Sequence, residues 1–307
     1  RIESGRNAVA GVAQITREYR LMEYREFGQT GMRLSAVALG GLLAHYWEGE
    51  SMHPPPEEKR RIYLRAAELG INLFDMGYGD EVHIPDELKG PRDDRHFSLK
   101  VGAPEADALE EMVDRHLSNV RREALDILRV HHYGYMEDEA LRERIAELKE
   151  AGKVRSLCLI RHFEKDQQIY IDSGPEPEAD ADLVIYNYVC RGQEPGIAAA
   201  AKAGKGVLIM KALGGQYLSW QHKNSTDWSQ ATEETLIELS PLGESMRHEL
   251  DLVYSFSTGP WRELAKAGEE VAPTGPAVAW VIKNKNVSSA LVAVASVEEL
   301  QAALACL

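Results

Sequence analysis

Cysteine is scarce in this sequence of 307 residues. Its three cysteines are Cys158, Cys190 and Cys306, and no two of them have the short spacing that metal-binding and redox motifs require. The count is also odd, so a reducing compartment is the simplest interpretation. We therefore expect no metal site, and we expect the protein in the cytoplasm.

Long apolar runs are also absent. No stretch approaches the roughly 18 apolar residues that a membrane-spanning helix needs, so the sequence does not predict a transmembrane protein. The weakly apolar run at Asn7–Ala13 follows Arg6 and resembles the end of an export signal, but it lacks a full apolar segment. We interpret residues 1–21 as an appendage outside the fold and residues 22–307 as one domain. Export through a lost N-terminal signal stays open as an alternative to the cytoplasm.

Basic residues are outnumbered by acidic ones. The chain has 35 Lys and Arg against 49 Asp and Glu, which gives a formal net charge of −14. Such a surface repels phosphate backbones and anionic lipid headgroups, which disfavours nucleic-acid binding and membrane-surface roles. We therefore expect a small molecule as the partner, while the sequence does not determine the oligomeric state.

What the sequence does contain is the composition of a globular protein, with 44% hydrophobic and 27% charged residues. From Ala36 onward, short apolar runs alternate with longer stretches of helical periodicity. The predicted strands are Ala36–Leu39, Ile71–Phe74, His96–Val101, Leu125–His131, Val154–Ile160, Ala181–Tyr186, Val207–Lys211 and Val287–Val294. The predicted helices include Pro56–Leu69, Glu105–Arg122, Glu137–Ala151, Ala198–Ala203 and Gly275–Lys283. Eight strand-helix units favour an α/β fold of the closed (β/α)8 TIM barrel type over an open sheet.

A long segment, residues 214–272, separates the seventh predicted strand from the next helix. Connections of this length inside a compact domain are usually functional. Its aromatic residues are Tyr217, Trp220, Trp228, Tyr254, Phe256 and Trp261. They are suited to covering an apolar ligand, and they are equally suited to burying the loop against the barrel.

Four polar residues lie at or just after the ends of predicted strands, where a barrel of this type places its active site. They are Asp75, Tyr78, Lys100 and His131. An ammonium beside a phenol lowers the pKa of the phenol, which makes it a better proton donor near neutrality. In this interpretation Asp75 holds Lys100, Lys100 tunes Tyr78, and His131 orients a carbonyl oxygen. No side chain can supply hydride to the carbonyl carbon, so the arrangement requires a redox cofactor.

The ordered motifs in the chain resemble those of the aldo-keto reductases. Residues 22–35 are similar to the hairpin that closes the barrel floor in that family, and Gly70–Asp75 followed by Tyr78-Gly79 is similar to the motif with the catalytic Asp and Tyr. Phe97–Lys100 resembles the strand with the catalytic Lys, and the step from Asp126 to His131 matches that of the catalytic His. Later segments that match in order are 152–155, 186–187 and 206–215. The resemblance covers roughly residues 22–305 and is nearest to a bacterial branch whose members often carry export signals or cysteine-bearing tails.

The resemblance implies a fold, an activity and a set of site residues. The implied fold is a single TIM barrel with an N-terminal hairpin and a long loop after the seventh strand, and the implied activity is reduction of an aldehyde or ketone with NADPH or NADH. The implied catalytic residues are Asp75, Tyr78, Lys100 and His131. The residues implied to bind the cofactor are Arg161, His162, Tyr186, Lys211, Leu213, Gly214, Gly215 and Ser296.

The sequence departs from the family pattern in three places. Tyr78 follows Asp75 by three residues where the family has five, so Tyr133 and Tyr135 are substitute proton donors. Ile160 and Leu183 stand where relatives carry polar side chains near the nicotinamide. The stretch 294–299 is acidic where relatives often hold a phosphate with basic residues, so the choice between NADH and NADPH is open.

These departures leave two alternatives. A barrel that kept Asp75, Lys100 and His131 but lost the cofactor would carry out acid/base chemistry, as a lyase or an isomerase. A barrel that lost catalysis altogether would act as a binding subunit.

Overall fold

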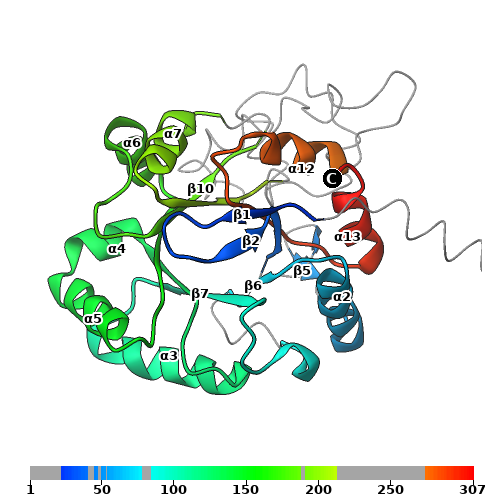
Figure 1. Ribbon diagram of the computed structural model, residues 1–307, viewed down its shortest axis with the longest axis horizontal. Coiled ribbons are helices and arrows are strands. Elements are labelled where there is room, and N and C mark those ends of the chain that lie inside the picture. Colours follow the sequence, from blue (N-terminus) through cyan, green and yellow to red (C-terminus); the bar gives the residue numbers. More distant parts are fainter. Residues whose placement is uncertain are drawn as a thin grey trace, which may run out of the picture.

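The computed structural model of the chain describes residues 22–40, 45–47, 50–52, 54–77, 84–187, 191–212 and 274–307. The N-terminal appendage, the segment 214–272 and Tyr78 lie outside these ranges. In the described part, a ring of helices surrounds a central barrel of strands, and a small hairpin lies across one end of the barrel (Figure 1).

The barrel consists of eight parallel strands in sequence order. They are β3 (Val37–Leu39), β6 (Leu73–Asp75), β7 (His96–Gly102), β8 (Ile127–His131), β9 (Leu157–Arg161), β10 (Ala181–Ile185), β11 (Gly206–Met210) and β12 (Ser289–Val292). Pairing of β12 with β3 closes the cylinder. The predicted (β/α)8 barrel is thus confirmed, and its strands differ from the predicted runs by a few residues at their ends.

Helices follow most of the strands and cover the outside of the barrel (Figure 1). They are α2 (Pro56–Glu68), α3 (Ala106–Val120), α5 (Glu139–Glu150), α6 (Glu164–Ser173), α7 (Glu194–Lys202), α12 (Thr274–Lys283) and α13 (Val297–Leu304). Shorter elements are the 3-10 turn η1 (Asp86–Leu88), the helix α4 (His132–Glu137) and a second hairpin of β4 (His45–Trp47) with β5 (Glu50–Met52).

The sequence analysis did not predict three of these helices, for different reasons. Helix α4 has only six residues, too few to display a periodic apolar face. Helix α6 buries Asp166 together with Tyr170, so a charge interrupts the apolar face by which such helices are recognised. Helix α13 did have a local signal, because Ser296 and Glu299 have the spacing of a capping box.

The N-terminal hairpin closes the floor of the barrel. It is formed by β1 (Tyr24–Glu26) and β2 (Arg33–Ser35), and the Arg25 guanidinium donates to the Val287 carbonyl at 2.7 Å. The buried ring of Phe27 packs so closely on Gly206 that a Cβ on this glycine would lie 2.4 Å from it. Gly28 has a φ of +55° and its own close approach to the Gly206 backbone, so the turn requires glycine there.

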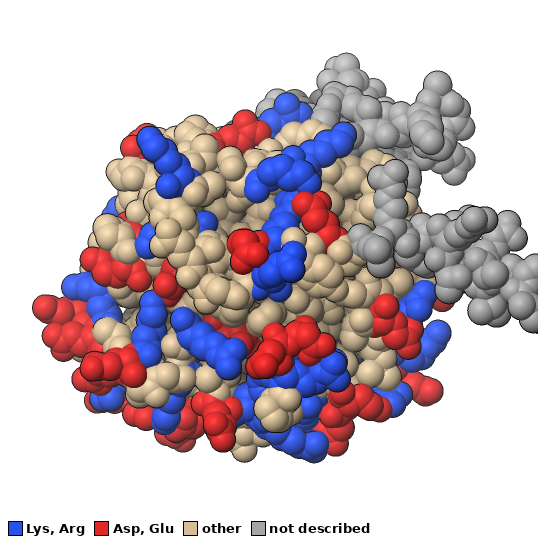
Figure 2. Space-filling view, viewed as in Figure 1, with Lys and Arg blue, Asp and Glu red and all other residues tan. Residues whose placement is uncertain are grey.

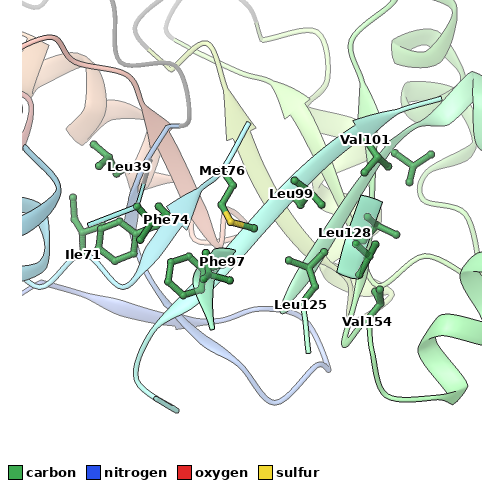
Figure 3. Packing of buried hydrophobic residues seen from close by; sticks show 14 of the residues in the cluster. Leu39, Ile71, Phe74, Met76, Phe97, Leu99, Val101, Leu125, Leu128 and Val154 are labelled. Carbon is green, nitrogen blue, oxygen red and sulfur yellow. The ribbon is translucent and has the colours of Figure 1, made fainter. Parts of the chain in front are cut away.

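Side chains alternate between the inside and the outside of the barrel. Inward-facing Leu73, Ile127, Ile160 and Leu208 fill the interior together with Phe27 from the hairpin. Outward-facing side chains of the same strands pack beneath the helices, and Figure 3 shows Phe74, Phe97, Leu99 and Leu128 in this outer layer. Burial on both faces explains why the strand sequences are apolar almost throughout.

The outer surface of the described part carries charges of both signs. On the face with the β1–β2 hairpin, Lys and Arg are interspersed with Asp and Glu rather than gathered into one basic area (Figure 2). None of the helices that the structure describes has the length and apolar character needed to cross a membrane.

Candidate active site

Three of the four predicted catalytic residues meet at the carboxyl end of the barrel. Asp75 is the last residue of β6, Lys100 lies near the end of β7, and His131 is the last residue of β8. The register pairs Asp75 with Ser98, and the Ser98 hydroxyl donates to the Asp75 carboxylate at 3.3 Å. Parallel neighbours thus bring the three side chains to one rim. The fourth, Tyr78, lies outside the described residues.

The Asp75 carboxylate forms its ion pair with Arg129, which the sequence analysis did not select. Arg129 is the β8 residue two positions before His131, so both side chains point into the barrel. The same Asp75 oxygen accepts a hydrogen bond from the Gly77 backbone N–H at 2.8 Å. The carboxylate that was expected to hold Lys100 is therefore held by Arg129, and both members of this pair are buried.

His131 is uncharged at neutral pH. Burial and the positive charge of Lys100 lower the pKa of His131 to about 4, with Arg129 acting in the same direction and Asp166 opposing them. The register pairs Lys100 with Arg129, two residues before His131, so Lys100 and His131 lie at the ends of neighbouring strands. A neutral imidazole carries one N–H, so it can donate a hydrogen bond to a carbonyl oxygen without being an acid of appreciable strength.

An aromatic wall adjoins His131, formed by Tyr133, His162 and Phe163. The His131 ring centroid lies 5.5 Å from those of Tyr133 and Phe163 and 6.5 Å from that of His162. Tyr133 is 38% exposed and Phe163 is 39% exposed, which is unusual for aromatic side chains beside a buried histidine. Tyr133 also borders a cavity of about 880 Å³ between the segment that follows β7 and helices α4 and α5. Tyr135, the other substitute donor, is buried.

Two predicted cofactor residues lie at this end of the barrel. His162 directly follows β9 and belongs to the aromatic wall. Lys211 follows β11 and has a φ of +57°, a conformation that costs free energy in a residue other than glycine and is common at functional sites. The Asn187 side chain donates to the Lys211 carbonyl at 3.0 Å and so supports this conformation. Leu213, Gly214 and Gly215 lie outside the described residues.

Three other predicted cofactor residues have side chains that are engaged in contacts with the protein. Arg161 points to the outer face of β9, where it is fully buried and donates to Asp182 at 2.8 Å. Tyr186 packs in the outer layer with Trp280 at a ring distance of 5.1 Å and donates to Glu194 at 2.9 Å. Burial and this bond raise the pKa of Tyr186 to about 12. Ser296 caps α13 by accepting the Glu299 N–H at 3.1 Å. All three residues lie at or just after the carboxyl ends of their strands, and their side chains are engaged by Asp182, Glu194 and the α13 backbone.

The residues that sequence reasoning missed carried signals of different strength. Arg129 shares the inward face of β8 with His131 because the side-chain period of a strand is two, so counting back from His131 finds it. Phe163 had no comparable local signal, because its contact with His131 joins segments that are distant in sequence.

A model of the aldo/keto reductase family matches residues 43–307 of this chain. The structure is similar to the holo form of the aldo-keto reductase AKR11C1 from Bacillus halodurans, with a TM-score of 0.62 and 18% identity over 93% of this chain and 90% of that one. It is also similar to a protein from Pseudomonas aeruginosa that is provisionally named an aldo-keto reductase, with a TM-score of 0.60 and 20% identity over 94% of this chain and 98% of that one.

At these identities the structural likenesses show the fold. No curated protein matches the sequence. The family assignment rests on the family model, which spans all four predicted catalytic positions and most of the barrel. The chain belongs to the aldo/keto reductase family of oxidoreductases.

Proposed function

We propose that this protein reduces an aldehyde or ketone, or oxidises the corresponding alcohol, with a nicotinamide cofactor. The observation that carries the proposal is the set of three predicted catalytic residues, Asp75, Lys100 and His131, at the carboxyl end of the barrel. A neutral His131 with Lys100 in electrostatic range lies at the carboxyl end of the barrel, in a chain that belongs to an oxidoreductase family.

Each residue of the site has a separate proposed role at the carbonyl oxygen of the substrate. His131 donates a hydrogen bond to this oxygen, and the Lys100 ammonium stabilises the negative charge that develops there during reduction. Asp75 and Arg129 neutralise each other beneath the site, which fixes the strand ends that carry Lys100 and His131. Tyr78 is the proposed proton donor to the oxygen, with Tyr133, whose ring lies beside His131, as the substitute.

The cofactor, when bound, supplies the hydride that no side chain can provide. The donors at the rim fit such a group. Lys100, His162 and Lys211 are suited to a diphosphate and a carboxamide, and the buried His131 Nδ1 has no hydrogen-bond partner among the described residues. The proposed binding residues are therefore Lys100, His131, His162, Lys211 and the segment 213–215.

We propose NADH as the preferred cofactor because the N-terminus of α13 is already occupied by acidic side chains. Glu58 accepts the Val297 N–H at 3.1 Å, and Glu299 accepts the Ala295 N–H at 2.7 Å. Free N–H groups at a helix N-terminus bind phosphate, whereas carboxylates in the same place repel it. Fluorescence titration is expected to give at least roughly fivefold tighter binding of NADH than of NADPH, since one unfavourable charge contact is worth about 1 kcal/mol or more.

The experiment that tests the function mixes the protein with NADH and a panel of aldehydes and ketones and follows the loss of cofactor absorbance. Lys100→Met is expected to lower kcat/KM by a hundredfold or more, because removal of one group that stabilises a developing oxyanion typically has about this cost. Turnover by Lys100→Met at the wild-type rate, or failure of the wild type to bind either nucleotide, would contradict the proposal.

One observation favours the cofactor-independent alternative. The side chains of Arg161, Tyr186 and Ser296 are engaged by Asp182, Glu194 and the α13 backbone, which leaves fewer of the predicted cofactor residues available. An acid/base enzyme on this barrel predicts no binding of either nucleotide, together with isomerase or lyase activity that depends on Lys100. The same titration therefore separates the two functions.

A further inference from the structure

A network of buried and partly buried polar side chains, most of them ionisable, lies behind the rim, on the outer side of the barrel. We call it the His132 network; its members are His132, Arg161, Asp166, Tyr170, Glu176 and Asp182. They come from the start of α4, from β9 and β10, and from α6 and the segment that follows it. None of these side chains belongs to the proposed catalytic set.

Both ring nitrogens of His132 face carboxylate oxygens. Nδ1 lies 3.0 Å from Asp166 Oδ1, and Nε2 lies 2.9 Å from Glu176 Oε1. A neutral imidazole has a single N–H, so it could donate to only one of the two carboxylates. The lone pair of its other nitrogen would then face a lone pair of the second carboxylate, which is repulsive. Hydrogen bonds to two ionised carboxylates need a ring with two N–H groups. The geometry therefore points to a doubly protonated, charged His132.

The surrounding charges support the same conclusion. Asp166 is 2% exposed, and a buried carboxylate without a positive partner is costly. The Arg161 guanidinium donates to Asp182 at 2.8 Å and lies over the Tyr170 ring at 5.2 Å. Its nearest approach to Glu176 is 3.8 Å, which is longer than a hydrogen bond. Among the described residues, the His132 ring is thus the group that contacts Asp166 and can carry positive charge. His131, its neighbour in the chain, has the opposite state because burial and the charges of Lys100 and Arg129 lower its pKa.

The network joins the two segments that carry the aromatic wall. His131 and Tyr133 flank His132 in the chain, and Asp166 lies three residues after Phe163. On the solvent-exposed side of these two segments, the centroids of the Tyr133 and Phe163 rings lie 5.3 Å apart. On the buried side, the bond from His132 to Asp166 ties the same segments together.

We propose that His132 is a charged positioning residue whose imidazolium, held between Asp166 and Glu176, fixes the placement of the His131 ring against Phe163. The effect on turnover rests on the proposed function, whereas the charge of His132 and the ring placement do not. His132 acts through His131 and does not itself contact the reacting atoms.

The charge is tested on the unmodified protein with 15N-labelled histidine, using a His132→Gln spectrum to assign the signals. At pH 7 we expect both ring nitrogens of His132 to carry protons and the His131 ring to be neutral. A His132 ring with one unprotonated nitrogen would contradict the proposed positive charge of His132.

The positioning role is tested with His132→Gln and with Asp166→Asn, which keeps the size of the side chain. His116→Gln is the matched control, because His116 is an equally buried histidine on α3, away from the rim. We expect the nuclear Overhauser contacts between the His131 and Phe163 rings to weaken or disappear in both network variants and to persist in the control. We also expect kcat to fall by about ten- to a hundredfold with KM changed less than about threefold, because small misplacements of a group that orients substrate act mainly on turnover.

The readouts separate the ways in which the inference can fail. If His132→Gln does not fold, Asp166→Asn decides. Network variants that keep both the ring contacts and kcat, or that lose activity only as much as His116→Gln, would overturn the positioning role. If the wild type reduces no carbonyl compound, the proposed function fails, and the ring contacts still decide the role of His132.

Discussion

At the scale of single residues, neighbouring positions in this chain have opposite environments. His131 faces two cations in the barrel, while His132 faces two carboxylates behind it. Likewise, Asp75 and Arg129 form a buried ion pair above the apolar residues that fill the barrel interior. Removing one partner of a buried ion pair destabilises the protein strongly, because little water is available to solvate the charge that remains.

The depressed pKa of His131 leads to the first prediction. Lys100→Met removes one of the cations that disfavour the imidazolium, so the pKa of His131 is expected to rise from about 4 toward 6.5. Titration of the His131 ring protons by NMR measures the change. Lys153→Met, which removes a lysine from the α3–α5 surface, is the control and is expected to leave the midpoint in place. An unchanged midpoint in Lys100→Met would show that Lys100 does not act on His131.

The ion pair leads to the second prediction. Arg129→Met leaves the Asp75 carboxylate buried without its partner, and we expect the free energy of unfolding in urea to fall by about 3–5 kcal/mol. Arg33→Met is the matched control, because Arg33 pairs with Glu26 on the surface, where both side chains are about two-thirds exposed. The control is expected to lose less than about 1 kcal/mol. Equal losses in the two variants would be inconsistent with a buried, coupled pair.

At the scale of elements, the hairpin and the barrel depend on each other. The Phe27 ring from the hairpin occupies the space that a side chain at the start of β11 would need. The hairpin is also tied to the loop before β12 through Arg25. Neither contact is local in sequence, so the floor of the barrel forms only when the first and last parts of the chain meet.

This contact leads to the third prediction. Gly206→Ala places a Cβ within 2.4 Å of the Phe27 ring, and the overpacking is expected to lower the free energy of unfolding by about 1–3 kcal/mol. Gly192→Ala is the control, because a Cβ there meets no atom within 4 Å. Denaturant unfolding followed by circular dichroism compares them. A Gly206→Ala protein as stable as Gly192→Ala would show that Phe27 does not close the floor in this way.

At the scale of the whole molecule, the excess of negative charge shapes access to the site. The formal net charge is −14, and the cavity beside Tyr133 is lined by several carboxylates, among them Glu105, Glu137 and Glu143. Fields of this kind act over about 10 Å at ordinary salt, so they influence which substrates approach the rim.

The fourth prediction concerns this field. For a neutral aldehyde such as benzaldehyde, kcat/KM is expected to be nearly independent of salt. For 4-carboxybenzaldehyde, kcat/KM is expected to be lower at about 20 mM salt and to rise several-fold at about 200 mM, because salt screens the repulsion. Steady-state rates with both substrates measure the difference. Identical salt dependence for the two would argue against an acidic approach to the site.

The sequence by itself determined the barrel, because the signal for it is repeated in every strand. Near-continuous apolar runs separated by helical stretches predict strands covered on both faces, and eight such units predict closure. It also selected Asp75, Lys100 and His131, since the carboxyl end of each strand can be read from the run that precedes it.

Only the tertiary structure decided which charges pair. Asp75 belongs with Arg129, Arg161 lies outside the barrel with Asp182, and His132 bridges Asp166 and Glu176. Local pattern gives the secondary structure and the side to which a residue points, because both follow from the period of the backbone. The partner of a buried charge depends on which distant segments are packed against it, and the closed fold alone sets that.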